Sequence, residues 1–372
     1  MHAPHIIIAG GGIAGLASAL ALGRHDALIL EQAAAFSAIG AGLQLGPNAV
    51  RALQKLGAWD AVEPITSSPP EIHMRDGVTG KLFKRLPLGA DFQNRYGAPY
   101  RVAHRADLHA ALLGVVKSRP NITMRLNEKI TSVDVHLDGL ILQSSAKPMA
   151  CQTLIVTDGV NSEIRQNLFA DSAAIASGHQ FHRALISVPD NFDVAMDCVN
   201  LWMYPYGHVV HYVIGNKQHL NIVAITPDDA TPTSHFSNAA PALRTLLNTA
   251  EPDFSSWPGL VAPKLGAWTR GNVLLLGDAA HGTLPYLAQG AAMALEDAAY
   301  LQAILPTTQS LRHAFAETSQ GRMIRTERLS QETRKAGKIY HLSGPMNLAR
   351  NLALKATPAI AITRRLDWLY RG

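Results

Sequence analysis

The sequence predicts a mixed α/β fold, in which a parallel-sheet domain is interrupted by an inserted β-sheet domain and followed by a C-terminal helical tail. Two observations lead to this fold class. An apolar run, His5 to Ala9, passes through a glycine-rich turn into a helix of small residues, Leu16 to Leu22, which is the strand–turn–helix order of parallel-sheet proteins. Residues 176–264 then contain several short apolar runs of strand length, and a helix-rich stretch extends from Gln289 to the end.

The composition is that of an ordinary globular chain. The 372 residues are 47% hydrophobic and 16% charged, enough for two domains or for one domain with an insertion. The net charge is +5, but the basic residues are scattered, which predicts a solvated surface and no nucleic-acid partner. Two cysteines, Cys151 and Cys198, cannot build a disulfide framework or by themselves a metal site, so we expect a cytoplasmic protein without a bound metal. The apolar stretch Ile6 to Leu22 is interrupted by glycines and has no basic leader, so no membrane span is predicted.

The stretch GGGIAG, Gly10 to Gly15, is the first of three glycine-centred motifs. Its glycines let the backbone approach a pyrophosphate, and the following helix offers free N–H groups and the positive end of its dipole. A second short strand, Leu28 to Leu30, ends at Glu31, an acid that can hydrogen-bond an adenosine ribose. The motif and its context therefore predict a Rossmann-type dinucleotide-binding domain.

Two later motifs and one glycine-rich loop follow the first motif along the chain. The run from Ile39 to Asn48 contains three glycines and a proline, and we expect a loop that passes close to a flat or bulky group. Asp158-Gly159 and Gly277-Asp278 each follow an apolar strand-like run. The block from Pro285 to Ala298 begins a helix packed with small residues. Each Asp–Gly pair alone would indicate only a turn, but the conjunction of the motifs indicates a common function.

The remaining pattern divides the chain into domains. A helix is predicted from Arg101 to Lys117, and residues 122–158 alternate in the manner of a β-meander. The predicted boundaries are 1–65, 98–175 and 265–330 for a discontinuous dinucleotide-binding domain, 66–97 and 176–264 for the β-sheet substrate domain, and 331–372 for the C-terminal helices.

In this order the motifs resemble those of the class A FAD-dependent aromatic hydroxylases, a family of flavoprotein monooxygenases, and the resemblance covers nearly the whole chain. The stretches Gly40 to Asn48, Pro285 to Ala298 and Leu366 to Tyr370 look most like the branch of salicylate, 3-hydroxybenzoate and 6-hydroxynicotinate hydroxylases. The resemblance implies FAD as cofactor and NAD(P)H as a transient co-substrate. It also implies hydroxylation of a phenolic or N-heteroaromatic acid with O2, through a flavin C4a-hydroperoxide.

The same resemblance implies the residues that hold FAD. Glu31 would bind the adenosine ribose, Arg105 the phosphates and ribityl chain, and Asp278 the ribityl hydroxyls. Asp158-Gly159 would serve both FAD and the nicotinamide cofactor, and the helix that begins near Ala288 would face the flavin pyrimidine with its positive end. The expected cofactor contacts are Gly10, Gly12, Ala14, Gly15, Glu31, Gln32, Gln44, Arg105, Ile130, Asp158, Asp278, Ala288, Gln289, Gly290, Ala291 and Ala292.

The chain departs from the family immediately before the second motif. The family pattern has a small Gly-Ala pair there, whereas this chain has Val156-Thr157. A bulkier pair either is accommodated by the surrounding residues or alters how the nicotinamide cofactor docks, and we expect accommodation.

The candidate catalytic residues lie on one predicted strand. Residues two and four apart on a strand share a face, so His208 and Tyr212 point one way and His211 the other. The His-x-x-x-Tyr spacing resembles the substrate-activating pair of the branch named above. It implies His208 as acceptor of a phenolic proton and Tyr212 as its hydrogen-bonding partner at the substrate. His211 is the alternative base if a bulge shifts the register.

The predicted substrate pocket consists of Gln44, Pro285 and Tyr286, although packing alone would also explain these residues. Three other functions stay open at this point. They are a flavin-dependent halogenase, whose Trp-x-Trp-x-Ile-Pro stretch is absent here, an oxidative tailoring or quinone-type hydroxylase, and a non-catalytic flavin-binding protein. The expected partners are a small aromatic substrate and O2, and a homodimer is an open alternative to a monomer.

Overall fold

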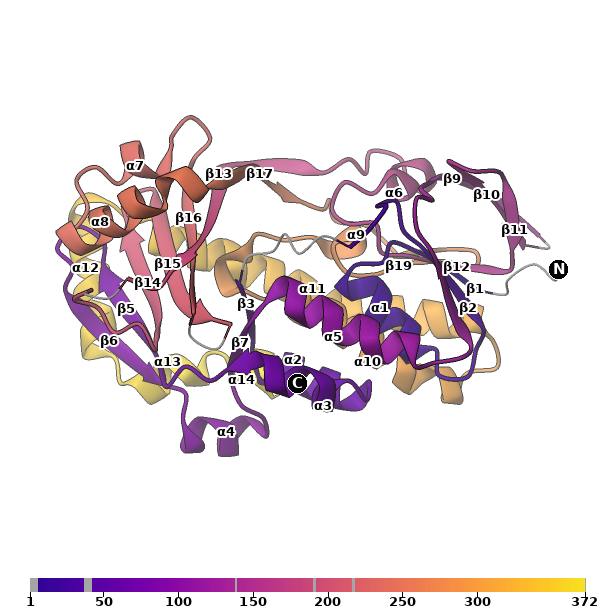
Figure 1. Ribbon diagram of the computed structural model, residues 1–372, viewed down its shortest axis with the longest axis horizontal. Coiled ribbons are helices and arrows are strands. Elements are labelled where there is room, and N and C mark those ends of the chain that lie inside the picture. Colours follow the sequence, from indigo (N-terminus) through magenta and orange to yellow (C-terminus); the bar gives the residue numbers. More distant parts are fainter. Residues whose placement is uncertain (1–5, 37–41, 138, 190–191, 216–217, 372) are drawn as a thin grey trace.

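The computed structural model describes residues 6–36, 42–137, 139–189, 192–215 and 218–371, so His5 of the first apolar run and residues 39–41 of the glycine-rich loop lie outside the described residues. Two large sheets lie at opposite ends of the molecule, and the long helix α11 (Leu311–Tyr340) runs from one toward the other (Figure 1). The predicted mixed α/β fold with C-terminal helices is confirmed.

The first large sheet has six strands and contains the predicted strand–turn–helix unit. Its order is β18-β19-β12-β1-β2-β8, and all neighbours are parallel except β18 and β19. Every residue of β1, β2 and β12 is buried, as expected for a parallel sheet covered on both faces. The strands are β1 (Ile6–Ala9), β2 (Ala27–Leu30), β8 (Ile122–Arg125), β12 (Thr153–Val156), β18 (Thr269–Arg270) and β19 (Val273–Leu275).

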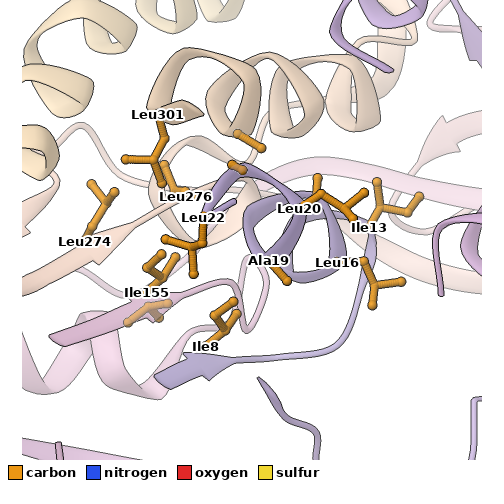
Figure 2. Packing of buried hydrophobic residues seen from close by; sticks show 14 of the residues in the cluster. Ile8, Ile13, Leu16, Ala19, Leu20, Leu22, Ile155, Leu274, Leu276 and Leu301 are labelled. Carbon is orange, nitrogen blue, oxygen red and sulfur yellow. The ribbon is translucent and has the colours of Figure 1, made fainter. Parts of the chain in front are cut away.

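Helix α1 (Ile13–Ala21) fills the space between this sheet and helix α10 (Gly290–Ile304), as Figure 2 shows. Ile8 and Ile155 project from the strands toward α1, and Leu301 of α10 closes the core on the other side. The small residues of α1 let α10 approach closely, because short side chains keep the two helix axes near each other. Helix α5 (Arg105–Lys117) also packs against α1.

The second large sheet has seven strands in the order β17-β13-β16-β15-β14-β5-β6. Strand β5 pairs in parallel with β14, so residues 71–87 join the same sheet as residues 175–261. Helices α7 (Pro232–His235) and α8 (Pro241–Ala250) cover one face. The strands are β5 (Glu71–Asp76), β6 (Leu82–Pro87), β13 (Ile175–Ser187), β14 (Val199–Tyr204), β15 (Gly207–Ile214), β16 (His219–Pro227) and β17 (Ser255–Val261).

The opposite face of this sheet packs against the C-terminal part of the chain. Met74 and Met203 lie there against Tyr340, at the end of α11, and against Leu354 of the following helix. Two small antiparallel sheets and several short helices complete the structure. These are β3 (Gly42–Leu45), β4 (Thr66–Ser67), β7 (Arg101–His104), β9 (Ile130–His136), β10 (Gly139–Ser144), β11 (Met149–Cys151), α2 (Pro47–Lys55), α3 (Trp59–Val62), α4 (Ala90–Tyr96), α6 (Glu163–Leu168), α9 (Asp278–His281), α12 (Gly344–Ala356), α13 (Ala359–Arg364), α14 (Asp367–Tyr370), and the 3-10 helices η1 (Glu63–Ile65), η2 (Glu251–Asp253), η3 (Pro285–Leu287) and η4 (Leu305–Thr307).

Three local predictions were wrong for the same reason. The helix predicted from Arg101 begins only at Arg105, because residues 101–104 form β7 and pair with β3. That partner, Gly42–Leu45, was predicted as loop. Strands β8 and β12 belong to the parallel sheet and not to a meander, of which only β9, β10 and β11 remain. In each case a partner distant in sequence overrode the local pattern. The domain boundaries stay a prediction.

Candidate active site

The glycine turn between β1 and α1 has a shape that requires glycine at two positions. Gly10 has a φ of +103°, and a Cβ there would lie 2.7 Å from the carbonyl oxygen of Thr157. A Cβ on Gly15 would lie 1.9 Å from the carbonyl oxygen of Gly10. Gly12 precedes α1, and a Cβ there would meet no atom within 4 Å among the described residues. The turn is therefore tightly packed at Gly10 and Gly15 and open at Gly12, where the first N–H groups of α1 begin.

Glu31 stands beside this turn, immediately after β2. Its carboxylate accepts hydrogen bonds from the backbone N–H of Gly11 at 2.7 Å and of Ala33 at 2.9 Å. The next residue, Gln32, is exposed. His109 of α5 reaches the same turn, with a ring nitrogen 2.7 Å from the carbonyl oxygen of Gly11. The acid predicted for the adenosine ribose therefore lies at the glycine motif, 21 residues after its first glycine.

The Gly277-Asp278 turn packs against the start of α1, close to the first glycine turn. Gly277 has a φ of +59°, and a Cβ there would lie 2.9 Å from the Cβ of Ala14, so glycine permits this close approach. Asp278 is exposed, and its Oδ1 lies 3.9 Å from the position that a Cβ of Gly290 would take. Asp278 is thus next to Gly290, the first residue of α10. The predicted cofactor contacts Ala288 and Gln289 directly precede this helix, and Gly290, Ala291 and Ala292 form its first turn.

The unusual Val156-Thr157 pair is accommodated at the end of β12. Val156 is fully buried in the core, and the Thr157 hydroxyl lies 2.8 and 3.0 Å from the carbonyl oxygens of Ala9 and Gly10. Asp158, which follows, has a buried Oδ1 with no hydrogen-bond partner among the described residues. Burial raises the pKa of Asp158 above its ordinary value. Through the hydroxyl contacts of Thr157, the Val156-Thr157 pair therefore braces the first glycine turn.

Three other predicted cofactor residues occupy different environments. Arg105 opens α5 and is exposed, and its charge acts on Arg183 of the seven-stranded sheet. Ile130 begins β9, and its side chain packs in the core. Gln44 lies in β3, where its side-chain oxygen accepts a hydrogen bond from the hydroxyl of Tyr100. Arg105 and Gln44 thus lie near Arg183 and Tyr212 of the seven-stranded sheet. The Ile130 side chain packs in the core, and its contact with the cofactor stays a prediction.

His208 is a buried residue near the start of β15, with 1% of its surface exposed. Its ring packs against Tyr286 and Tyr340, with centroids 5.2 and 5.3 Å away. Its Nδ1 lies 2.8 Å from Nε2 of His341, at the end of α11. Burial, and then the neighbouring His341 and His179, lower the pKa of His208 well below its ordinary value. The imidazole is therefore neutral at neutral pH and can accept a proton.

Tyr212 shares the sheet face with His208 but does not contact it. Four residues along a strand span about 13 Å, and Tyr212 belongs to a separate cluster that includes Tyr100. The side chain that contacts His208 directly by a hydrogen bond is His341, and the role of Tyr212 as a hydrogen-bonding partner at the substrate stays a prediction. Burial raises the pKa of Tyr212, with a smaller opposing effect of Arg183, so its hydroxyl stays protonated.

The 3-10 helix η3 carries the predicted pocket residues Pro285 and Tyr286 to the same sheet face. The Tyr286 ring fits against α11 because residue 337 is glycine, where a Cβ would lie 2.4 Å from a ring carbon. The Tyr286 hydroxyl is buried without a hydrogen-bond partner among the described residues. Tyr286 therefore adjoins His208, and Pro285 precedes it in η3, whereas Gln44 adjoins the Tyr212 end of the face.

His211 lies on the opposite face of β15. Its ring stacks on Trp202 with centroids 6.1 Å apart, and both ring nitrogens are buried without a partner among the described residues. The pairing of β15 with β14 and β16 has no register shift. The bulge that would have brought His211 to the other face is therefore not present in this strand.

Arg183 is a residue that the sequence reasoning missed. The register places it opposite Val223, which in turn lies opposite Val210, so Arg183 shares the face of His208. Its guanidinium lies 4.5 Å from the centroid of the Trp257 ring and has no acidic partner among the described residues. Burial lowers the pKa of Arg183, but a guanidinium stays charged. A single arginine in an alternating strand gives no signal by itself, since its position on this face follows only from the pairing of distant strands.

Comparison with known proteins identifies the family. Residues 4–310 match the family described as FAD binding domain. The chain is 32% identical over 382 residues to the 3-hydroxybenzoate 6-hydroxylase of Polaromonas naphthalenivorans (strain CJ2), with 98% of this chain and 95% of that protein covered. The chain belongs to the FAD-dependent aromatic hydroxylases.

Further relatives agree with this assignment. The hydroxylase is 33% identical over 331 residues to the 6-hydroxynicotinate 3-monooxygenase of Bordetella bronchiseptica (strain ATCC BAA-588 / NCTC 13252 / RB50), with 84% of this chain and 85% of that protein covered. In fold it is similar to Klebsiella pneumoniae HpxO complexed with FAD and uric acid, at a TM-score of 0.88 and 22% identity, with 99% and 97% of the two chains covered. The predicted family, the enzyme class and FAD as cofactor are confirmed.

The residues at the three turns of the hydroxylase fit FAD. Gly12 and Gly159 are positions where an added Cβ would meet no described atom within 4 Å, which suits a group lying against the backbone. The buried Oδ1 of Asp158 has an unused hydrogen-bonding capacity, and the exposed carboxylate of Asp278 can accept from hydroxyl groups. The fit supports the predicted contacts at the glycine turns, which stay predictions residue by residue.

Three further features bear on ligands and partners of the hydroxylase. In the described part of the chain, no helix is both long and apolar enough to cross a membrane. Glu71, His73 and Cys198 bring potential metal-ligand atoms within 4.8 Å of one another, and Nε2 of His73 is hydrogen-bonded to the Glu71 carboxylate at 2.6 Å. A homodimer, a cytoplasmic location and the lack of a bound metal stay predictions.

A cleft of about 500 Å³ reaches Tyr212, and its lining consists of Ser67, Ser68, Pro69, Pro70, Val102, Asp197, Tyr212 and Val213.

Proposed function

We propose that the hydroxylase adds one oxygen atom from O2 to an aromatic acid, phenolic or N-heteroaromatic, with NAD(P)H as a transient electron donor. The observation that carries this proposal is one face of the seven-stranded sheet, which presents His208, Tyr212 and an arginine without an acidic partner, Arg183. The relatives support the substrate class, because 3-hydroxybenzoate and 6-hydroxynicotinate, named in their activities, are both hydroxylated aromatic acids.

Each of these side chains has a role that its chemistry allows. FAD, when bound, supplies the oxygen-transfer chemistry. Arg183 would bind the carboxylate of the substrate, because a guanidinium offers two parallel N–H donors to a carboxylate. His208, which is neutral, would accept the proton of a ring hydroxyl and so make the ring more electron-rich. Tyr212, which keeps its proton, would orient the substrate by a hydrogen bond, and Tyr286 would exclude water.

Oxidation of NADH and NADPH by the FAD-loaded hydroxylase tests the proposal. We would measure it with and without 3-hydroxybenzoate, 6-hydroxynicotinate, 3-amino-4-hydroxybenzoate and salicylate, and identify products by mass spectrometry. The expected result is strong stimulation by at least one acid, together with a product heavier by one oxygen atom. Stimulation that yields only hydrogen peroxide, or no response to any acid, would contradict an aromatic acid of this size as the substrate.

The role of Arg183 is tested by comparing KM for each acid with KM for the corresponding carboxamide. Arg183→Gln is expected to raise KM for the acid by about ten- to a hundredfold, the loss of a hydrogen bond to a charged group, and to leave KM for the amide nearly unchanged. Arg85→Gln is the matched control, because Arg85 is an arginine of the same sheet with 63% of its side chain exposed. An equal rise in KM for acid and amide would assign Arg183 to packing.

A further inference from the structure

The hydrogen bond between His208 and His341 joins two parts of the chain 133 residues apart. His341 follows α11 directly, and its backbone oxygen accepts a hydrogen bond from the N–H of Tyr206, at the exposed turn before β15. His208 is buried, whereas His341 is half-buried. The pair therefore forms a continuous hydrogen-bonded path from the interior sheet face toward the surface.

The geometry also determines which nitrogen of His208 is available to a substrate. Burial, and then the neighbouring histidines, lower the pKa of His341 to about 3, and the pKa of His208 is lowered as well, so both rings are neutral at neutral pH. A hydrogen bond between neutral imidazoles needs one N–H donor and one acceptor. When His208 Nδ1 donates to His341 Nε2, the Nε2 of His208 carries a free lone pair, as a base requires.

We propose that His341 is the second member of a proton relay, which receives a proton from His208 and passes it to solvent. The inference rests on the proposed function, in which His208 takes the proton of a ring hydroxyl. In this relay, a residue of the C-terminal helical tail, His341, takes part in a proton transfer that begins at the sheet residue His208.

The relay balances at every atom. The substrate O–H bond breaks and an N–H bond forms at Nε2 of His208, while the N–H bond at Nδ1 of His208 breaks and one forms at Nε2 of His341. A proton then leaves Nδ1 of His341 to water. Because arrival and departure are coupled, His208 need not hold a full positive charge in its buried position, where burial makes that charge costly. Reprotonation of the hydroxylated product by the reverse path restores both starting tautomers.

The groups around His341 favour onward transfer over retention of the proton. His179 from β13, His235 from α7 and Arg350 from α12 all act on its charge in the same direction. The ring of Tyr286 lies 5.5 Å away by centroid. Within the described part of the chain, no carboxylate is among the causes of the lowered pKa of His341. Since burial and the charge of Arg350 both disfavour an imidazolium at this position, a proton on His341 moves to solvent.

Stopped-flow measurement of proton release tests the relay. The oxidised, FAD-loaded hydroxylase would be mixed with 3-hydroxybenzoate, or with whichever panel acid yields product, in weak buffer with a pH indicator and without NAD(P)H. His341→Asn is expected to slow proton release about a hundredfold, the lower end of what a positioned acid–base group contributes, with little change in Kd of the acid. Added imidazole should restore the rate in His341→Gly. Tyr340→Phe is the matched control, because its ring also packs on His208 without a hydrogen bond to it.

Two outcomes separate the relay from the proposed function. Normal release in His341→Asn together with loss of release in His208→Asn would overturn the relay alone. Normal hydroxylation by His208→Asn would overturn the role of His208 itself. A readout independent of any substrate is the nitrogen NMR spectrum of histidine-labelled protein, with His208 assigned from the His208→Asn variant. The relay requires the Nδ1–H tautomer at His208, and an Nε2–H tautomer there would overturn it.

Discussion

Asp297 and Arg322 form a buried ion pair, with 2.7 Å between Asp297 Oδ1 and Arg322 Nε. The other carboxylate oxygen of Asp297 accepts hydrogen bonds from the backbone N–H of Gly277 at 3.1 Å and from His281 at 2.5 Å. Burial alone would raise the pKa of Asp297, but His281 and Arg322 outweigh it and lower the pKa below its ordinary value. The pair therefore anchors the turn that carries Asp278 to helices α10 and α11.

Removal of Asp297 should weaken both folding and FAD binding. Asp297→Ala leaves the buried guanidinium of Arg322 with Glu296 as its one acidic partner among the described residues and frees the Gly277 turn. We therefore expect a loss of about 3–5 kcal/mol in the free energy of unfolding by urea. Purified variant should also carry less FAD. Asp134→Ala, at an exposed aspartate on β9, is the control and should change stability by less than about 0.5 kcal/mol. A loss below about 1 kcal/mol for Asp297→Ala would contradict the anchoring role.

Substitutions in the glycine motif should separate folding from cofactor binding. Gly15→Ala places a Cβ 1.9 Å from the Gly10 oxygen, so the folded protein should be scarce or strongly destabilised. Gly12→Ala meets no described atom within 4 Å, so the melting temperature of the FAD-free protein should stay unchanged. The Kd for FAD should nevertheless rise at least about tenfold, because the added methyl group obstructs the approach of the pyrophosphate. Equal FAD affinity in Gly12→Ala and wild type would place the pyrophosphate elsewhere.

The hydroxyl of Thr157 should contribute measurably to stability. Thr157→Val keeps the shape of the side chain but removes the donor that faces the carbonyl oxygens of Ala9 and Gly10, so we expect a loss of about 0.5–1.5 kcal/mol. Thr157→Ser keeps the hydroxyl and should lose less. Thermal and urea unfolding of both variants provide the measurement, and a valine variant as stable as wild type would show that the hydroxyl does not brace the turn.

His211 should make the fold sensitive to acid. Burial lowers its pKa from an ordinary 6.5 to about 3, so between these values the unfolded chain binds a proton that the folded chain does not. Its contribution to stability is therefore fully present above pH 6.5 and is lost as pH falls toward 3. His211→Leu removes both the titration and two unpaired buried nitrogens. The variant should be as stable as wild type or more so at pH 7, and its unfolding free energy should fall less between pH 6.5 and 4. A steeper fall in the variant would contradict this account.

Local patterns in the sequence determined much of the FAD-binding part. The strand–turn–helix unit rests on apolar periodicity and on a backbone that favours glycine at close approaches, and both are properties of neighbouring residues. Gly10, Gly15 and Gly277 occupy the close approaches that their motifs predict, and Glu31 lies beside the first turn. The alternation along β15 likewise predicted that His208 and Tyr212 share a face opposite to His211.

Only the tertiary structure decided what meets these residues. Periodicity specifies the face that a side chain occupies but not the element that covers this face, because the cover comes from helices and strands distant in the chain. No local pattern therefore indicated that His341 contacts His208 or that Arg183 lies on the same sheet face as Tyr212. Strand β7 likewise could not be predicted without its pairing partner β3. The sequence by itself determined the family, the cofactor turns and the strand that bears the candidate base, whereas long-range packing decided which side chains that base contacts.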